Sequence, residues 1–421
     1  MTYILYIMAF IYLFLPLQFA LSPFPGIDLA VFRVCVVIIT LCFLCISLVK
    51  KNIFIPLGFV SAFFSAFFMW IFFSAFISPV PFWTLRKILF FVTLFPLFYI
   101  LTTFFVKKTQ SIQIILQSIV YGGLIVSLVS IIQFFLQFFI SLNKLLSFWG
   151  AFTPFFLGHT FSESVITHNS WLVHVGSHDL MRAIAFFPDP HMFSFYLGMI
   201  APFSLFLFSS TQKQKWIFAF LVILCADLLT FSRGGYIGLL FGITTGIIFF
   251  WNNLSAKIKR LTMLILLFCF FIILVPQNPI TQRFVSSFSL VDHSVTHRIE
   301  LWSESIAEIK KRPFLGTGLG AYSYTINPHA DYRTPIYVHN LFLDIAVELG
   351  LPGLFLFINI FFAMFFIFYK KKEILTRFAI ISVSIFIGHS FFDTALFSVH
   401  VIPILLFIFA IASYYENSSR T

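Results

Sequence analysis

The sequence predicts an all-α, polytopic integral membrane protein with about twelve transmembrane helices and two larger outer-face loops. Of the 421 residues, 60% are hydrophobic and only 10% are charged, whereas a soluble domain carries roughly a quarter charged residues. Apolar runs of about 20 residues recur along the whole chain, and each is long enough to cross a bilayer core. The net charge of +11 gathers largely in the short links between these runs. It therefore indicates membrane topology, and no nucleic-acid partner is predicted.

The twelve predicted spans and their links form one membrane domain, residues 1–421. The first apolar run lacks the basic start and the cleavage site of a signal peptide, so it is predicted to be a span. Two long loops interrupt the series, at 141–190 and at 277–338. The spans are predicted at about 3–21, 28–49, 53–78, 88–106, 113–140, 191–209, 215–232, 234–251, 260–276, 346–369, 376–394 and 398–415.

Basic residues in the short links predict the orientation of the spans. With a cytoplasmic N-terminus, the cytoplasmic links contain Lys50–Lys51, Lys107–Lys108 and Lys370–Lys372, and further basic residues near positions 213 and 260. Glu373 is the one acid among them. This is the positive-inside pattern. Both termini are then predicted to be cytoplasmic, and both long loops to lie on the outer face.

Ionisable side chains concentrate on that outer face. Nine histidines, from His159 to His339, lie in or beside the two long loops. Arg233, in the stretch "TFSRGGYIG", stands at the outer end of a span. A charge near hydrocarbon costs several kcal/mol, so ionisable residues at such a place indicate function.

The second long loop, 277–338, contains a predicted amphipathic helix. The stretch "THRIELWSESIAEIKKRP" carries Ile299, Trp302, Ile306 and Ile309 at helical spacing, and a proline ends it. The helix is expected to lie on the outer surface or to cap the bundle.

The rest of this loop holds motifs that admit two interpretations each. The glycines of "PFLGTGLGAYSY" either form tight turns or bind phosphate. Arg298 and Arg312 are either anion contacts or ordinary solvated residues. In "YVHNLFLDIAVELGLPG", His339 opens the next span, while Asp344 and Glu348 share one face roughly opposite to it. These two acids either pack inside the bundle or belong to a site.

The first long loop ends in "RAIAFFPDPHMFSFYLG", residues 182–198. Arg182 opens this stretch, and Asp189-Pro190-His191 makes a sharp entry into the following span. A proline turn with a helix cap accounts for the last three residues. Arg182 and His191 are weaker candidates for substrate contacts.

Together these stretches resemble the O-antigen ligase and polymerase superfamily of bacterial membrane glycosyltransferases. The matching pieces are "TFSRGGYIGLL", the arginine ahead of tryptophan in "HRIELW", "RPFLGTGLGAY" and "HNLFLDIAVELGLPG". Their order, their spacing and the large outer loop between two late spans all agree. The matching core covers roughly residues 180–370.

The resemblance implies a glycan donor linked through diphosphate to a polyprenyl lipid such as undecaprenyl diphosphate. The transfer would take place at the outer face of the bacterial inner membrane. His339 and Arg233 are carried over as catalytic residues, and Arg298 as a contact to diphosphate or saccharide. His339 would activate an acceptor hydroxyl as general base or hold diphosphate as imidazolium. Arginine suits diphosphate because its planar fork bonds phosphate oxygens bidentately. No metal-binding carboxylate pair is evident, so a metal-independent reaction without a cofactor is expected.

The acceptor is not encoded in any recognised motif. The spacing around His339 and the length of the outer loop favour ligation of the glycan to lipid A–core. Polymerisation of repeat units on a growing glycan is the first alternative. A lipid-linked saccharide flippase or ion-coupled transporter is the second, because Asp227, His389 and Asp393 lie within predicted spans.

Overall fold

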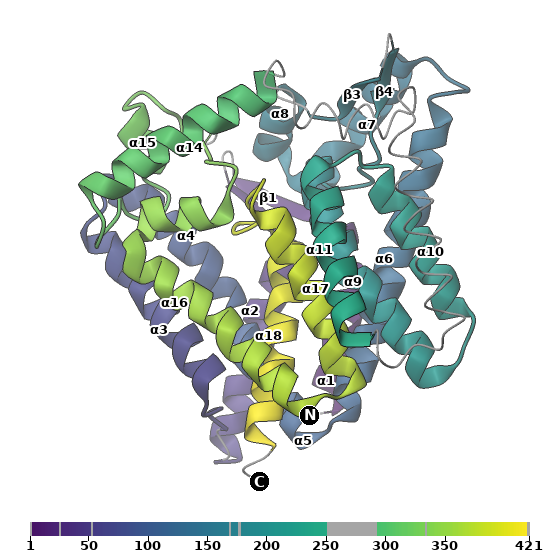
Figure 1. The fold of residues 1–421 in the computed structure, drawn as a ribbon, viewed down its shortest axis with the longest axis vertical. Coiled ribbons are helices and arrows are strands. Elements are labelled where there is room, and N and C mark those ends of the chain that lie inside the picture. Colours follow the sequence, from purple (N-terminus) through teal and green to yellow (C-terminus); the bar gives the residue numbers. More distant parts are fainter. Residues whose placement is uncertain are drawn as a thin grey trace.

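The computed structural model describes residues 2–24, 27–51, 54–167, 170–175, 178–250, 293–332 and 335–418. The chain is an all-α polytopic membrane protein, as the sequence predicts, and its long helices run along the vertical axis of Figure 1. The predicted span 260–276 and the loop segment 277–292 lie outside the described residues.

The helices and strands follow one another in a single bundle with two small hairpins. The helices are α1 (Thr2–Phe14), η1 (Leu15–Leu17), α2 (Val31–Val49), α3 (Phe59–Phe73), η2 (Ser74–Phe76), α4 (Pro81–Leu94), α5 (Pro96–Lys107), α6 (Gln110–Leu136), α7 (Leu142–Leu157), α8 (His159–Thr167), α9 (Pro190–Thr211), α10 (Lys215–Leu228), α11 (Arg233–Phe250), α14 (His293–Lys311), α15 (Tyr322–Ile326), α16 (Leu341–Lys371), α17 (Ile374–Ser390) and α18 (Val401–Asn417). The strands pair antiparallel as β1 (Ala20–Phe24) with β2 (Ile27–Ala30) and β3 (Leu172–Val175) with β4 (His178–Met181).

Among the described residues, seven helical segments are long and apolar enough to cross a membrane. Three shorter apolar helices, at Tyr3–Leu17, Ile374–Ser390 and Val401–Asn417, accompany them. Helices occupy eleven of the twelve predicted spans, and the remaining span, 260–276, lies outside the described residues. The predicted count of twelve crossings stays a prediction, because length and composition alone define these segments.

The two ends of the bundle differ in character. In Figure 1, α1 begins and α18 ends near the lower end, whereas α8, α14, α15 and the β3–β4 hairpin lie at the upper end. Near the end of α18, the hydroxyl of Tyr414 lies 3.2 Å from that of Thr109, and Tyr415 donates to Glu373 over 2.5 Å. Thr109 and Glu373 each directly follow a run of lysines. Two of the lysine-rich links therefore lie at the same end of the bundle as the C-terminal helix end.

Helix α16 is broken at Gly350, whose backbone is left-handed with φ 70° and ψ 178°. A break in a helix leaves carbonyls without intrahelical partners. Here the backbone N–H groups of Thr317 and Gly318 donate to the carbonyls of residues 347 and 348, and the Trp70 indole donates to that of residue 349. The glycine-rich turn therefore supports the break in α16, and this tight-turn role accounts for its glycines without a phosphate.

Both long loops contain helices that differ from expectation in detail. The first, 141–190, folds into α7, α8 and the β3–β4 hairpin. The second contains the predicted amphipathic helix as α14, but Leu301 and Ser305 form its buried side. Ile299 and Ile306 are exposed. Because α14 packs on α16, its orientation follows that contact: Trp302 and Ile309 of the predicted row pack inward, whereas Ile299 and Ile306 do not.

Candidate functional site

The candidate site is built around His339, the second residue before α16 begins at Leu341. Its backbone is left-handed with φ 55°, a conformation that is uncommon for residues other than glycine. Such strained positions cluster at functional sites, and they persist only where the surrounding structure holds them in place.

Neighbours on both sides fix the backbone around His339. Asp344 accepts a hydrogen bond from the N–H of Val338 over 2.9 Å, and the Trp302 indole of α14 donates to the Val338 carbonyl over 3.0 Å. The Asn340 side chain caps α16 by accepting from the N–H groups of residues 342 and 343. It also donates to the Phe391 carbonyl over 3.2 Å. The segment is therefore tied both to α14 and to the loop that follows α17.

That loop supplies Asp393, which is the centre of the cluster. One carboxylate oxygen lies 3.3 Å from Nδ1 of His339 and accepts the Thr394 N–H over 2.8 Å. The other oxygen lies 3.7 Å from Nδ1 of His191. The Asp393 side chain is only 10% exposed. Two histidines from separate elements therefore face one buried carboxylate.

The charges in this cluster influence one another. Burial would lower the pKa of His339, but the hydrogen bond to Asp393 and the charge of that carboxylate outweigh it and raise the pKa above its ordinary value. Burial would raise the pKa of Asp393, but the hydrogen bond and charge of His339 outweigh it, with help from Arg298, and lower the pKa. The two shifts favour an imidazolium beside a carboxylate at acidic pH, and the neutral imidazole of His339 forms as pH rises through its raised pKa.

His191 is placed by the start of α9. Asp189 caps this helix by accepting from the N–H groups of His191 and Met192, both over 2.8 Å, and Pro190 occupies the first turn. Burial and the charge of Asp393 raise the pKa of Asp189 to about 6. The structure agrees with the predicted proline turn and cap, and this cap holds the His191 ring beside Asp393.

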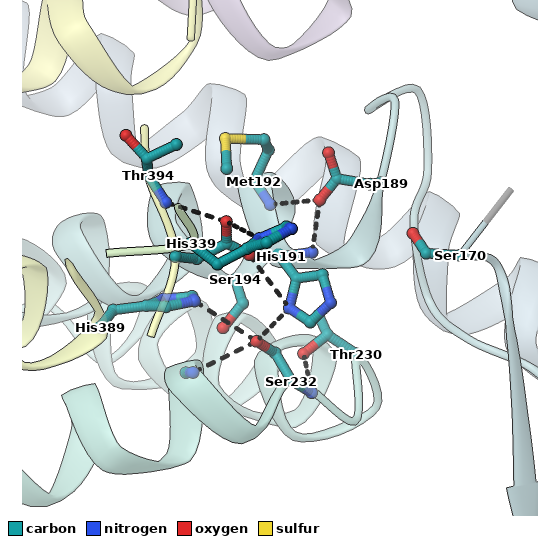
Figure 2. Close-up of polar contacts among 12 residues, drawn as sticks. Ser170, Asp189, His191, Met192, Ser194, Thr230, Ser232, His339, His389 and Thr394 are labelled. Atoms are coloured by element: carbon teal, nitrogen blue, oxygen red, sulfur yellow. Dashed lines mark hydrogen bonds and ion pairs between the residues drawn. The ribbon is translucent and has the colours of Figure 1, made fainter. Parts of the chain in front are cut away.

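Ser232 connects His191 to a further histidine (Figure 2). Its hydroxyl lies 3.1 Å from Nδ1 of His191 and 3.4 Å from Nε2 of His389. His389 belongs to α17, and its ring stacks on Phe195 of α9 at 3.6 Å between centroids. Helices α9, α11 and α17 pack side by side (Figure 1), and this packing brings His191, Ser232 and His389 together.

Arg233 is the first residue of α11 and is 7% exposed. The two glycines after it have a packing role. A Cβ on Gly234 would lie 2.5 Å from His389 Cδ2, and one on Gly235 would meet the Ser194 hydroxyl. Gly234 and Gly235 therefore let α11 approach α17 and α9, which brings Ser232 next to His191 and His389 and places Arg233 directly after it in the chain.

The remaining predicted arginines fall in different places. Arg182 is buried and donates to the backbone carbonyls of Ser170 over 3.1 Å and Thr230 over 2.6 Å, so it holds together the segments around the cluster. Arg298 is half-buried, and its charge acts on Asp393, His339 and His191.

Arg312 is exposed at the far end of α14 from Arg298. Fourteen residues of helix separate them by about 21 Å, so these two arginines do not bind one small group together.

A cavity of about 560 Å³ opens beside the cluster. Its lining joins the cluster around His339 to the N-terminal part of the chain and to aromatic side chains, whereas Arg233 and Arg298 are not part of it. The lining includes Arg33, Asp28, His191, Tyr337, His339 and Asp393. Among the described residues, no group of three or more His, Cys, Asp or Glu side chains is arranged as metal ligands.

The sequence missed the residue that organises this site. From sequence alone, Asp393 and His389 are polar residues of a predicted span that would suit a transporter, and Ser232 has no signal of its own. The four-residue spacing of His389 and Asp393 was visible. Nothing local could show that the loop after α17 meets the residues before α16.

Comparisons with known proteins agree with the motifs. Residues 218–358 match the family model described as O-antigen ligase. The chain is also 26% identical over 163 residues to a Rickettsia typhi protein that is provisionally named a polysaccharide ligase. That alignment covers 36% of this chain and 40% of the relative's length. The resemblance to the O-antigen ligase superfamily is confirmed.

Proposed function

We propose that this protein is a membrane glycosyltransferase that moves a glycan from a polyprenyl diphosphate carrier to an acceptor saccharide. The observation that carries the proposal is the His339–Asp393 pair on the wall of a cavity, 3.3 Å apart. His339 and Arg233 both lie within the segment that matches the O-antigen ligase family.

The pair has the arrangement of a general base with its orienting carboxylate. Because Nδ1 of His339 faces Asp393, Nε2 is the nitrogen available to an acceptor hydroxyl. The carboxylate favours the tautomer with hydrogen on Nδ1 and stabilises the imidazolium that forms on proton transfer. The hydroxyl oxygen would then attack the anomeric carbon as the bond to the diphosphate oxygen breaks. The proton ends on Nε2 of His339 and the electron pair on the leaving diphosphate.

Arg233 and Arg298 are proposed to bind that diphosphate. Arg233 directly follows Ser232, whose hydroxyl contacts His191, and the charge of Arg298 acts on Asp393. Guanidinium groups bond phosphate oxygens bidentately and stabilise the charge that grows on a leaving group. A single displacement by the acceptor oxygen inverts the configuration of the anomeric carbon, so we propose an inverting transfer, and we propose that it is metal-independent. Arg182 and His191 would then act mainly by shaping the site.

The proposed location is the outer face of a bacterial inner membrane, with both termini cytoplasmic. The lysine-rich links at Thr109 and Glu373 meet the end of α18, and basic links favour the cytoplasmic side. No nucleotide pool exists beyond that membrane, so a donor there must carry its own leaving group. A lipid-linked diphosphate meets this need, and membrane lipid is then a natural partner.

Ligation of the glycan to lipid A–core is the acceptor reaction that we favour, with repeat-unit polymerisation on a growing glycan as the alternative. A flippase or ion-coupled transporter has less support. Asp393 and His389 join the cluster around His339 and His191 rather than a separate path. Asp227, buried in α10, accepts a hydrogen bond from the Ser194 hydroxyl over 2.5 Å.

The test is transfer by purified full-length protein in detergent, with a polyprenyl-diphosphate-linked glycan and without nucleotide or divalent metal. Glycan on lipid A–core, resolved by gel, supports ligation. Longer lipid-linked chains with no movement to lipid A–core support polymerisation. Flipping or uptake in vesicles, with no new glycosidic bond from either acceptor, would contradict the transferase proposal.

A further inference from the structure

We propose that Arg33 is a phosphate-binding residue on the wall of the cavity that also holds His339. This goes beyond the arginines that the motifs indicate, and it rests on the proposed function in one respect: the substrates carry phosphate. The phosphate belongs either to the lipid carrier or to the acceptor saccharide.

The guanidinium of Arg33 is held against the neighbouring helix α4. Arg33 is the third residue of α2 and is half-buried. Nε donates to the Thr93 hydroxyl over 2.9 Å, and Nη2 donates to the Leu89 carbonyl over 3.4 Å. The guanidinium carbon lies 4.9 Å from the centroid of the Phe90 ring. All three partners belong to α4, so the side chain is held against a neighbouring helix rather than extended towards lipid headgroups.

The partners of this guanidinium are neutral. Within the described residues, Arg33 makes no ion pair with a carboxylate, and its hydrogen bonds go to a hydroxyl and a carbonyl. A half-buried charge without a counter-charge is costly. The planar fork retains N–H groups beyond the two that are used, and phosphate oxygens match that fork.

The carboxylates that line the same cavity accept hydrogen bonds from groups other than Arg33. Asp28 accepts from the Ser22 hydroxyl over 2.6 Å and from the Phe161 N–H over 2.9 Å. Asp189 caps α9, and Asp393 pairs with His339. Among the described residues, none of the three forms an ion pair with Arg33. The cavity therefore presents a fixed cation that an anionic group of a ligand could balance, beside the imidazole that would perform the chemistry.

Arg86 provides a matched control. It lies on α4, and its guanidinium carbon stands over the rings of Phe82 at 5.1 Å and Tyr332 at 4.6 Å. Like Arg33 it is a half-buried arginine stacked on aromatic side chains. Unlike Arg33 it is not part of the cavity lining. A general effect of removing one positive charge would therefore appear in both variants.

Binding is measured with the full-length protein in lipid nanodiscs, on a His339→Ala background so that no turnover occurs. One arm compares farnesyl diphosphate with farnesol. The other compares lipid A–core before and after its phosphates are removed. In one arm, Arg33→Ala is expected to weaken binding of the phosphorylated probe at least 10-fold. Binding of the matching phosphate-free probe should not change. Arg86→Ala should stay within 2-fold of the parent.

The arm that responds identifies the source of the phosphate. Loss of farnesyl diphosphate binding assigns Arg33 to the carrier, and loss of phosphorylated lipid A–core binding assigns it to the acceptor. If Arg33→Ala does not fold, Arg33→Lys is used instead. Its affinity for the phosphorylated probe is expected to fall about 3-fold, because lysine keeps the positive charge but lacks the planar guanidinium that bonds two phosphate oxygens. Unchanged binding of both phosphorylated probes by a folded Arg33 variant would overturn the proposal. A wild type that binds these probes through Arg33 but forms no glycosidic bond would refute the proposed function and leave the phosphate site standing.

Discussion

Replacing Asp393 by asparagine should lower the rate of glycosyl transfer about 100-fold while leaving the protein folded. Asparagine has nearly the same size, so the change removes the charge and alters the hydrogen bond to Nδ1 of His339. Its amide can also donate to Nδ1, which favours the tautomer with hydrogen on Nε2. That tautomer cannot accept a proton from the acceptor hydroxyl, so orientation and charge are lost together.

The magnitude follows from the geometry of the pair. Two unit charges 3.3 Å apart attract by about 5 kcal/mol at an effective dielectric constant of about 20. The His339 side chain is 39% exposed, and solvent screening reduces this to about 2 kcal/mol. That corresponds to about 30-fold in rate. Loss of the productive tautomer brings the expected effect to about 100-fold, at the lower end of general acid–base contributions.

The assay is steady-state transfer measured from pH 5 to pH 9. In the wild type, activity should rise with pH through the raised pKa of His339, because a base must be neutral to accept a proton. Asp393→Asn should move this rise to lower pH, since the charge that raises the pKa is gone, and should also lower the plateau. Activity that falls as pH rises would show that His339 acts as an imidazolium instead. A plateau within 2-fold of wild type would refute the reasoning.

Three further substitutions test how the site is held. Asp189→Ala should lower the stability of the protein by about 1 kcal/mol through loss of the helix cap, seen as a fall in Tm, whereas Asp189→Asn keeps the cap and should stay close to wild type. Gly234→Ala places a Cβ 2.5 Å from His389 Cδ2, so it should lower folding stability by about 1–3 kcal/mol and abolish most activity. The control Gly246→Ala, whose Cβ would have its nearest neighbour at 3.5 Å, should be tolerated. Equal Tm values for the two variants would contradict the packing argument. Trp302→Phe removes one hydrogen bond to the segment before α16, worth about 1 kcal/mol, and should lower kcat several-fold with little change in KM; a change confined to KM would argue against a positioning role.

Stability should also depend on pH through the central pair. The raised pKa of His339 means that its contribution is complete below the ordinary histidine pKa and is lost as pH rises through the folded value. The lowered pKa of Asp393 means that its contribution is present above the ordinary aspartate pKa and is lost as pH falls towards the folded value. The Tm difference between wild type and His339→Ala should therefore be largest in mildly acidic buffer and shrink above neutral pH. A difference that grows with pH would contradict the assigned pairing.

The spans could be predicted from sequence because hydrocarbon imposes one simple requirement, a long apolar run, and α6 or α9 meets it without help from neighbours. The same criterion does not detect the short helices and the hairpin within the outer loops. Phe148, Phe152 and Phe155 repeat at helical spacing in α7, yet the segment is too short to indicate a crossing, so the sequence predicts only a long loop there. The break of α16 was also missed, because Gly350 and the turn at Thr317 support each other across more than thirty residues of chain.

The candidate site divides in the same way. His339, Arg233 and Arg298 could be identified because each sits in a short motif that can be recognised from nearby residues. Asp393 could not, since it lies 54 residues from His339 in the chain and meets it only where the loop after α17 contacts the residues before α16, as the hydrogen bond from Asn340 to the Phe391 carbonyl also shows. Local periodicity places a side chain on a face of its own helix. It does not say which loop of another helix that face will meet.

The most direct test of the central claim is a single-turnover experiment with purified protein and a radiolabelled polyprenyl-diphosphate-linked glycan. Donor binding and appearance of the new glycosidic bond are followed separately, in wild type and in His339→Ala. The proposed mechanism predicts that both proteins bind the donor within about 3-fold of each other, and that only the wild type forms product and releases polyprenyl diphosphate. Product formation by His339→Ala at near wild-type rate would contradict the assignment of this site as the place where the glycosidic bond is made.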